Sequence, residues 1–221
     1  MSGCGRIIRG VIFDLDGVLV STDEMHFQAW KELADREGIP FNRHDNERLK
    51  GVSRARSLDI ILEKAVKRYS EDQKSAMASA KNDRYRELLA MLAPRDALVG
   101  AGEMLTGLRA MGVKLAVGSS SRNAREILRR VDLLRLLDSV VDGTDVSRSK
   151  PDPEAFLLAA ARLGLRPIEC LVVEDAAAGV EAGIRGGFSV LGIGDPKLLT
   201  GAGRWLSGLS KTGAAELIAG W

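Results

Sequence analysis

The chain has 221 residues, of which 45% are hydrophobic and 28% are charged. This length can bury one large or two modest cores, and the composition excludes disordered, collagen-like and disulfide-rich proteins. Lys and Arg number 32 against 30 Asp and Glu, which leaves a net charge of +2. The segment 23–93 alone holds 14 basic and 13 acidic residues, so no part of the chain predicts a nucleic-acid or membrane surface.

The cysteines and the apolar runs favour a cytoplasmic protein. Cys4 and Cys170 are too few for a disulfide framework, and we expect two reduced thiols. The longest purely apolar run, 155–161, is far shorter than the roughly 20 residues of a membrane span. The N-terminus also lacks the apolar stretch of a signal peptide.

Short β-branched runs and helical patterns alternate along most of the chain. The first predicted strand, 11–13, is followed by a segment with only helical patterning, at 22–36, 54–68 and 71–92. Beyond it, the pattern predicts strands at 113–117, 139–141, 171–173 and 189–193, separated by helices at 102–111, 123–131, 152–163 and 176–185. Strands separated by single helices are typical of a parallel, Rossmann-like α/β sheet with three layers.

The helical segment after the first strand is interpreted as an inserted cap. Ser70 and Gln73 form a capping-box pattern at the start of its last helix. The entry and exit of the segment flank one strand–helix unit, so we expect the cap to cover the carboxyl ends of the strands. The expected division is a core of 1–20 and 94–221 and a helical cap of 21–93.

Two pairs of acids follow predicted strands. Asp14 and Asp16 come directly after the first strand, and Glu174 and Asp175 end the fourth. Each pair has an ordinary alternative, a turn for the first and a helix N-cap at Asp175 for the second. If the chain winds outward from the first strand and returns to lay the fourth beside it, both pairs meet at the ligand-binding switch point of the sheet.

Four converging carboxylates call for a cation, and oxygen ligands favour Mg²⁺ over zinc. The chain has just two histidines, His26 and His44, and no HExxH or CxxC pattern, which argues against a transition-metal site. Because Mg²⁺ in proteins commonly pairs carboxylates with a phosphate, phosphoryl chemistry is the natural hypothesis.

Two further strand ends could bind a phosphate. The turn 117–123 offers hydroxyls and N–H groups at a helix start, and Lys150 precedes a proline-started helix. Taken singly, each is also compatible with an ordinary exposed loop. No complete GxGxxG or GxxxxGK[ST] pattern competes for the phosphate, and GxSxG is absent.

These residues together resemble the motifs of the haloacid dehalogenase-like phosphotransferase superfamily. The counterparts occur in order as Asp14-x-Asp16, Ser119, Lys150 and Glu174-Asp175, and the similarity covers roughly residues 7 to 195. Within the superfamily, the insertion is most similar to the cap of the β-phosphoglucomutase subfamily, through the segments 22–30, 46–54 and 81–83.

The resemblance implies roles for the core residues. Asp14 would be the phosphorylated nucleophile and Asp16 the general acid and base, with Asp14, Asp16, Glu174 and Asp175 holding Mg²⁺. Ser119 and Lys150 would neutralise the phosphoryl oxygens during transfer.

The resemblance also implies a substrate-binding set. Arg54 would bind the non-transferring phosphate, together with the loop residues Ser119, Ser120, Ser121, Arg122 and Asn123. Sugar binding or cap closure would involve Lys50, Gly51, Lys81, His26 and Trp30, with His26 gating the proton of Asp16.

The implied activity is a β-phosphoglucomutase that interconverts β-glucose 1-phosphate and glucose 6-phosphate through a 1,6-bisphosphate. A Mg²⁺-dependent sugar-phosphate phosphatase stays open, because it uses the same core, and so does a non-catalytic phosphosugar-binding protein. Sugar phosphates are the expected partners of a monomer, since a cap must move freely. The chain departs from the family at Val20, Ser21 and Val99, and 197–221 has no expected catalytic role, with Trp205 and Trp221 as packing residues.

Overall fold

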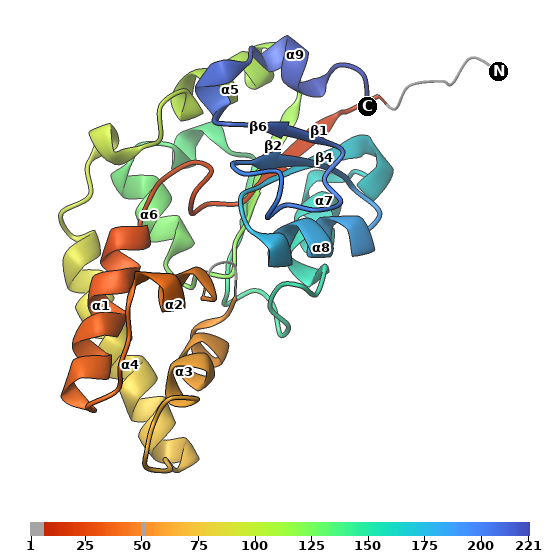
Figure 1. The fold of residues 1–221 in the computed structure, drawn as a ribbon. Helices are drawn as coiled ribbons and strands as arrows, with labels where there is room; N and C mark the ends of the chain where they lie inside the picture. Colours follow the sequence, from red (N-terminus) through yellow and green to blue (C-terminus); the bar gives the residue numbers. More distant parts are fainter. Residues whose placement is uncertain (1–6, 50–51) are drawn as a thin grey trace.

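A computed structural model describes residues 7–49 and 52–221, and its centre is a six-stranded parallel sheet (Figure 1). The strands are β1 (Gly10–Phe13), β2 (Lys114–Gly118), β3 (Ser139–Val141), β4 (Cys170–Glu174), β5 (Ser189–Ile193) and β6 (Arg204–Leu206). The five predicted strands are confirmed to within one residue. The sixth, β6, was not predicted.

The strand order places the ends of β1 and β4 side by side. The order is β3-β2-β1-β4-β5-β6, so the chain winds outward through β2 and β3 and then returns to the other side of β1. Phe13 on β1 lies opposite Val117 on β2 and Val173 on β4. The predicted switch point is therefore confirmed, and the residues that follow β1 and β4 meet at one edge of the sheet.

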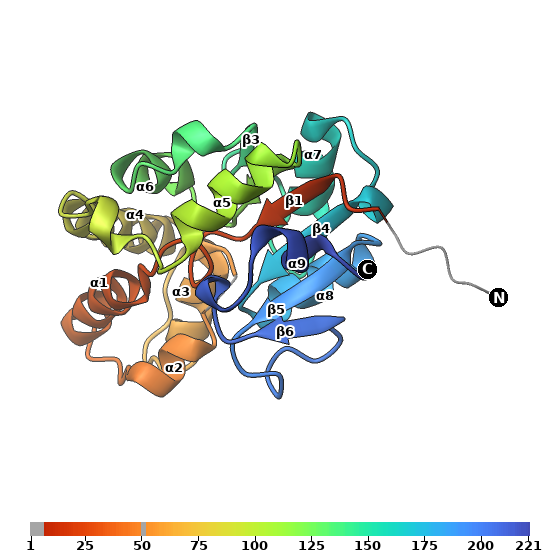
Figure 2. The same cartoon turned by 90° about the horizontal axis from the view of Figure 1, so that it is seen from above.

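Helices cover both faces of the sheet, as Figure 2 shows from above. One face packs against α5 (Ala101–Ala110), α6 (Ala124–Arg130) and α9 (Ala214–Ile218), and the other packs against α7 (Glu154–Leu163) and α8 (Ala177–Arg185). Because successive strand residues point to opposite faces, Val11 and Phe13 join the first core while Ile12 joins the second. This confirms the three-layer α/β fold.

Four helices lie between β1 and α5 in the chain, beside the sheet in Figure 1: α1 (Asp23–Arg36), α2 (Arg43–Glu47), α3 (Arg54–Leu62) and α4 (Glu71–Leu89). They bury a hydrophobic cluster of their own, which includes Trp30, Phe41 and Leu58. The predicted capping box at the start of α4 is confirmed, because Ser70 and Gln73 each accept the other's backbone N–H.

Three details of this helical segment differ from the prediction, the first being that α4 ends at Leu89 rather than at residue 92. The short helix α2 was not expected, because five residues are too few for a periodic pattern; its first turn is capped by Asn42 and Asp45. The helix α3 ends at Leu62 rather than at residue 68. Val66 is fully exposed, so the chain beyond Leu62 has little apolar surface with which to stabilise another turn.

The two connections to the helical segment run beside each other. The Leu98 N–H donates to the Leu19 carbonyl at 2.9 Å, and Val20 pairs with Ala97 in an isolated antiparallel bridge. The connections that enter and leave the helical segment are thus hydrogen-bonded to each other.

The C-terminal stretch completes the core on one face of the sheet. Leu217 on α9 is fully buried, and Trp221 packs against the same core cluster and donates its Nε1–H to the Leu217 carbonyl at 2.8 Å. Trp205, on the edge strand β6, is 42% exposed. The packing role expected for Trp221 is therefore confirmed, whereas Trp205 packs on one side only.

The expectations about thiols and membrane spans can be compared with the described residues. Cys170 is a buried free thiol, and Cys4 lies outside the described residues. Over residues 7–49 and 52–221, no helix combines the length and the hydrophobicity needed to cross a bilayer.

The substitution Leu105→Ala tests the packing of α5 on the sheet. Leu105 is fully buried, so its truncation should lower the free energy of unfolding by about 3 kcal/mol through lost burial and the cavity left behind. Urea unfolding measures this, with Met111→Ala as the exposed control just beyond α5. Equal, small losses in both variants would contradict the packing described.

Candidate functional site

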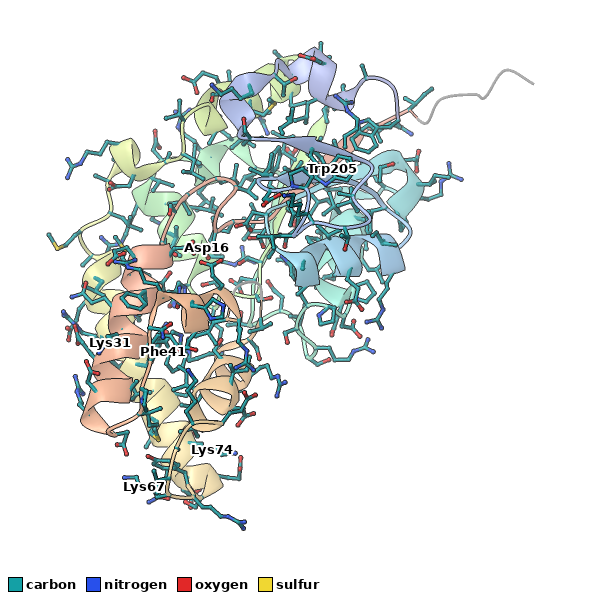
Figure 3. All side chains as sticks on the ribbon, viewed as in Figure 1. Asp16, Lys31, Phe41, Lys67, Lys74 and Trp205 are labelled. Atoms are coloured by element: carbon teal, nitrogen blue, oxygen red, sulfur yellow. The ribbon has the colours of Figure 1, made fainter. Side chains whose placement is uncertain are left out.

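A cavity of about 540 Å³ lies where the carboxyl edge of the sheet faces α1, α3 and α4. Most of the side chains singled out in the sequence line it: Asp14, Asp16, His26, Trp30, Arg54, Lys81, Ser119, Ser120, Ser121, Arg122, Asn123 and Asp175. Figure 3 shows Asp16 at the junction between the sheet and the helical segment. Lys150 and Glu174 lie buried beside Asp14, behind the cavity wall, and Lys50 and Gly51 fall outside the described residues.

Lys150 joins two carboxylates under the floor of the cavity. Its Nζ donates to Asp14 and, at 2.8 Å, to Glu174 Oε1, and it lies 4.6 Å from the centre of the Phe156 ring. Burial raises the pKa of Asp14 to about 7; the Lys150 charge opposes this rise, and the Glu174 charge adds to it. The lysine therefore offsets the repulsion between two acids that face each other in a dry site.

Three of the acids can hold a cation together. One carboxylate oxygen from each of Asp14, Glu174 and Asp175 lies within 4.8 Å of the others. All three donors are hard oxygen atoms, which fits a divalent metal such as Mg²⁺ better than a soft one. Glycines make room for this set: a Cβ on Gly179 would stand 1.7 Å from Glu174 Oε1, and one on Gly17 would stand 1.9 Å from Asp175 Oδ2.

Asp16 has a different environment from Asp14. The Thr22 hydroxyl donates to Asp16 Oδ1, and the Tyr85 hydroxyl donates in turn to Thr22 Oγ1 at 2.9 Å. Burial raises the pKa of Asp16 to about 6, although the Thr22 hydrogen bond lowers it in part. A carboxyl group with this pKa can both give and take a proton near neutral pH.

Lys81 is held by aromatic side chains of the helical segment. It is 3% exposed and lies 4.7 Å from the centre of the Trp30 ring and 4.5 Å from that of Tyr85. Its Nζ lies 2.9 Å from His26 Nδ1. Burial and the neighbouring Lys81 charge keep the pKa of His26 well below its usual value, so the neutral imidazole can accept a hydrogen bond from Lys81.

His26 was expected to gate the proton of Asp16. The hydrogen bond described for its Nδ1 goes to Lys81, whereas the one described for Asp16 comes from Thr22. The gating role stays a prediction.

A loop after β2 forms one side of the cavity. Ser119 Oγ accepts the Ser121 N–H at 3.0 Å, and Ser121 Oγ accepts the Asn123 N–H at 3.2 Å. These bonds hold the turn that precedes α6. Asn123 Nδ2 also donates to Asn82 Oδ1 on α4 at 3.1 Å, which links the loop directly to the helical segment.

Two guanidinium groups share this cavity. Burial and the nearby Arg122 charge lower the pKa of Arg54. The structure gives neither guanidinium an ion-pair partner within residues 7–49 and 52–221. Two positive groups in one cavity, with Arg54 partly buried, are suited to binding an anion.

Three residues of the site were not given a role from the sequence. Thr22 and Tyr85 form the hydrogen-bond chain to Asp16, and Asn82 contacts Asn123. A threonine ahead of a helix and a tyrosine within one have ordinary structural explanations, so no local pattern distinguishes them. The available signal was that Thr22 and Asn82 fall within segments of family resemblance, 22–30 and 81–83.

Oxygen ligands for a hard cation stand beside donors for an anion at the switch point of a parallel sheet. That combination is what phosphoryl transfer requires, and it defines the class of the protein as an enzyme of phosphoryl transfer.

Comparisons with known proteins give the family. The model of the haloacid dehalogenase-like hydrolases matches residues 8–187. The chain is 43% identical to the β-phosphoglucomutase of Bacillus subtilis over 88% of this chain and 87% of that protein. It is 34% identical to a phosphorylated carbohydrates phosphatase of Thermotoga maritima, over 89% and 92% of the two chains. A solved β-phosphoglucomutase from Clostridium difficile superimposes with a TM-score of 0.91 at 33% identity, over 96% of each chain.

The chain belongs to the haloacid dehalogenase-like family, as its motifs suggested, and its helical segment is part of the same likeness. It is an enzyme with an acidic cluster able to bind a divalent metal.

Gly179→Ala tests the space around Glu174. The added methyl group would overlap the Glu174 carboxylate, so the variant should bind Mg²⁺ at least tenfold more weakly, as measured by titration calorimetry. Gly213→Ala is the control, because a Cβ there meets nothing within 4 Å. Unchanged affinity in Gly179→Ala would show that Glu174 takes no part in cation binding.

Asp14 should make the stability of the metal-free protein depend on pH. Its folded pKa of about 7 lies above the ordinary 3.8, so the folded protein holds a proton that the unfolded chain releases. This contribution is fully present below about pH 4 and is lost as the pH rises through about 7. In EDTA, the free energy of unfolding of the wild type should therefore fall relative to Asp14→Asn over this range.

Asp195→Asn is the control for this pH series, because Asp195 is exposed and does not line the cavity. A wild type that gains stability relative to Asp14→Asn as the pH rises would mean that Asp14 is ionised throughout.

Proposed function

We propose that the protein is a Mg²⁺-dependent β-phosphoglucomutase, which interconverts β-glucose 1-phosphate and β-glucose 6-phosphate. The observation that carries the proposal is the presence of two cationic places around one cavity: Lys150, buried behind the wall beside Asp14, and Arg54 near Arg122 in the lining itself. A mutase must hold a bisphosphate in either orientation, with one phosphate at the reacting carboxylate and the other at a fixed distance from it. The likeness to two β-phosphoglucomutases supports the same choice.

In the proposed mechanism, Asp14 is the nucleophile. One of its carboxylate oxygens attacks phosphorus, the bond between phosphorus and the sugar oxygen breaks, and Asp14 becomes a phospho-aspartyl residue. Asp16 gives its proton to the departing sugar oxygen. Lys150 and Ser119 offset the negative charge of the transferring group.

The second half of the proposed cycle reverses these steps on the other sugar oxygen. The ionised Asp16 takes the proton from a sugar hydroxyl, whose oxygen attacks the phosphorus of phospho-Asp14. When the attacking hydroxyl belongs to C6 of β-glucose 1-phosphate, the product is the 1,6-bisphosphate. Its reorientation then presents the C1 phosphate to Asp14, and the next attack by Asp14 releases glucose 6-phosphate. A pKa of about 6 suits Asp16 to both directions of proton transfer.

We propose Asp14, Glu174 and Asp175 as side-chain ligands of Mg²⁺, with Asp16 contributing its backbone carbonyl. The cation would neutralise charge on the phosphoryl group and on the crowded acids. We propose residues 1–20 and 94–221 as the catalytic core and 21–93 as the cap, in a cytoplasmic monomer. The separate hydrophobic cluster of α1–α4 and the paired connections at residues 19–20 and 97–98 support this division.

For the substrate, we propose that Arg54, Ser121, Arg122 and Asn123 bind the non-transferring phosphate, together with Ser120. His26, Trp30 and Lys81 would face the sugar, and the same part is proposed for Lys50 and Gly51, which lie outside the described residues.

A sugar-phosphate phosphatase is the second candidate. The relative from Thermotoga maritima that is 34% identical to this chain is a phosphatase of phosphorylated carbohydrates. Phosphatase and mutase would share every core residue and would differ in whether water or a sugar hydroxyl receives the phosphoryl group from Asp14.

Product analysis tests the choice between them. The enzyme is supplied with β-glucose 1-phosphate, Mg²⁺ and a trace of β-glucose 1,6-bisphosphate, and glucose 6-phosphate and inorganic phosphate are measured together. The proposal expects glucose 6-phosphate in large excess. Steady release of inorganic phosphate without glucose 6-phosphate would make the protein a phosphatase.

Arg54→Ala tests the second phosphate site. Loss of charge-assisted hydrogen bonds to the distal phosphate should lower kcat/KM for isomerisation by about 100-fold, while hydrolysis of acetyl phosphate, which has no second phosphate, should change little. Arg56→Ala, an exposed change on the same helix, is the matched control. Isomerisation that survives Arg54→Ala would contradict the proposed site.

A further inference from the structure

Asn46 is a buried polar residue that the proposed mechanism does not use. It lies on α2, lines the cavity and is 8% exposed. Its Oδ1 is buried and has no hydrogen-bond partner among the described residues. Leaving a buried amide oxygen unpaired costs free energy, so the position calls for a partner that is present when the protein works.

The backbone around Asn46 is firmly held. Its N–H donates to the Asn42 carbonyl at 3.1 Å, and its own carbonyl accepts the Leu49 N–H at 3.0 Å. Asp45 accepts the Asn42 N–H at 3.0 Å and pairs with Lys64 at 2.6 Å. The backbone that carries the Asn46 side chain is therefore fixed in the cavity wall. We expect the hydrogen-bond partner of Asn46 Oδ1 to be a ligand that enters the cavity.

The chemistry of the cavity wall indicates what that partner is. The charged groups, such as Arg54 and Arg122, match phosphate. Asn46 carries no charge, and nearby positions that line the same cavity are the apolar Leu49, Val52 and Trp30. A sugar hydroxyl is neutral and both donates and accepts hydrogen bonds. It can therefore pair with the Asn46 amide whether the oxygen or the nitrogen of the amide faces the cavity.

We propose that Asn46 binds a ring hydroxyl of the substrate sugar and thereby selects sugar phosphates over smaller phosphate esters. The proposal rests on the proposed function, because it takes a hexose phosphate as the occupant of the cavity. It adds a specificity contact from α2 to the phosphate contacts, and it explains why a buried position among apolar neighbours carries an amide.

Asn46→Leu, which keeps a similar volume, tests the contact. Loss of one hydrogen bond made equally to substrate and transition state should raise KM for β-glucose 1-phosphate about tenfold with little change in kcat. KM for acetyl phosphate, which has no ring hydroxyl, should stay the same. This second substrate also shows on the same preparation that the variant is folded and that Asp14 still reacts.

Deoxy sugars identify the hydroxyl. The 2-, 3- and 4-deoxy forms of glucose 6-phosphate are compared with the parent in the wild type and in Asn46→Leu. The wild type should lose about tenfold in affinity for one of them, whereas the variant should bind that form and the parent equally. Such a cycle isolates the pair formed by Asn46 and one hydroxyl.

His44→Leu is the matched control, because His44 lies on the same short helix and is exposed. Asn46→Ser serves as a second variant that keeps a polar group but shortens its reach, and it should show a smaller rise in KM. The proposal is overturned if KM for the sugar phosphate is unchanged in Asn46→Leu, or if it rises equally for acetyl phosphate.

The Asn46→Leu kinetics and the product analysis test different proposals and can fail independently. A wild type that hydrolyses sugar phosphates without isomerising them would remove the mutase proposal, while the KM shift specific to sugar substrates would still support Asn46. A wild type that does not bind hexose phosphates at all would overturn both.

Discussion

The site depends on the close approach of like charges at the ends of two neighbouring parallel strands. Asp14 follows β1 and Glu174 ends β4, and both are buried. Their repulsion in a dry environment would be costly without the Lys150 ammonium group that contacts both. Lys150 is itself completely buried beside the Phe156 ring, so the three charges form one unit in which the ends of β1 and β4 position the two acids.

This unit also explains the placement of glycine around it. Gly179, near the start of α8, lies against the Glu174 carboxylate, and Gly17, in the left-handed region at φ 80°, lies against Asp175. A side chain at either position would occupy the space that the acids need. The space that the crowded carboxylates need is thus provided by neighbouring residues without a Cβ, and the strand order brings both strand ends to the same cavity.

The sequence was informative wherever one local pattern determines the outcome. Alternating apolar runs located five strands, and the acids that follow two of them indicated the switch point. The edge strand β6 and the helix α2 escaped prediction because three and five residues carry no period. The partners of Asp16 and the orphaned amide of Asn46 depend on contacts between distant segments, such as the one from Tyr85 to Thr22, which spacing alone cannot express.

The paired connections at residues 19–20 and 97–98 have a mechanical consequence. Two strands of chain that are hydrogen-bonded to each other bend as one ribbon, so a rotation of α1–α4 would have a single axis instead of two independent pivots. Asp16 and Val20 pair at the core end of this ribbon, and Thr22 precedes α1 at its other end. Any swing of the helices would therefore alter the Thr22 hydroxyl and the Asp16 carboxyl in the same movement, so that in the proposed mechanism proton transfer and enclosure of the substrate would share one moving part.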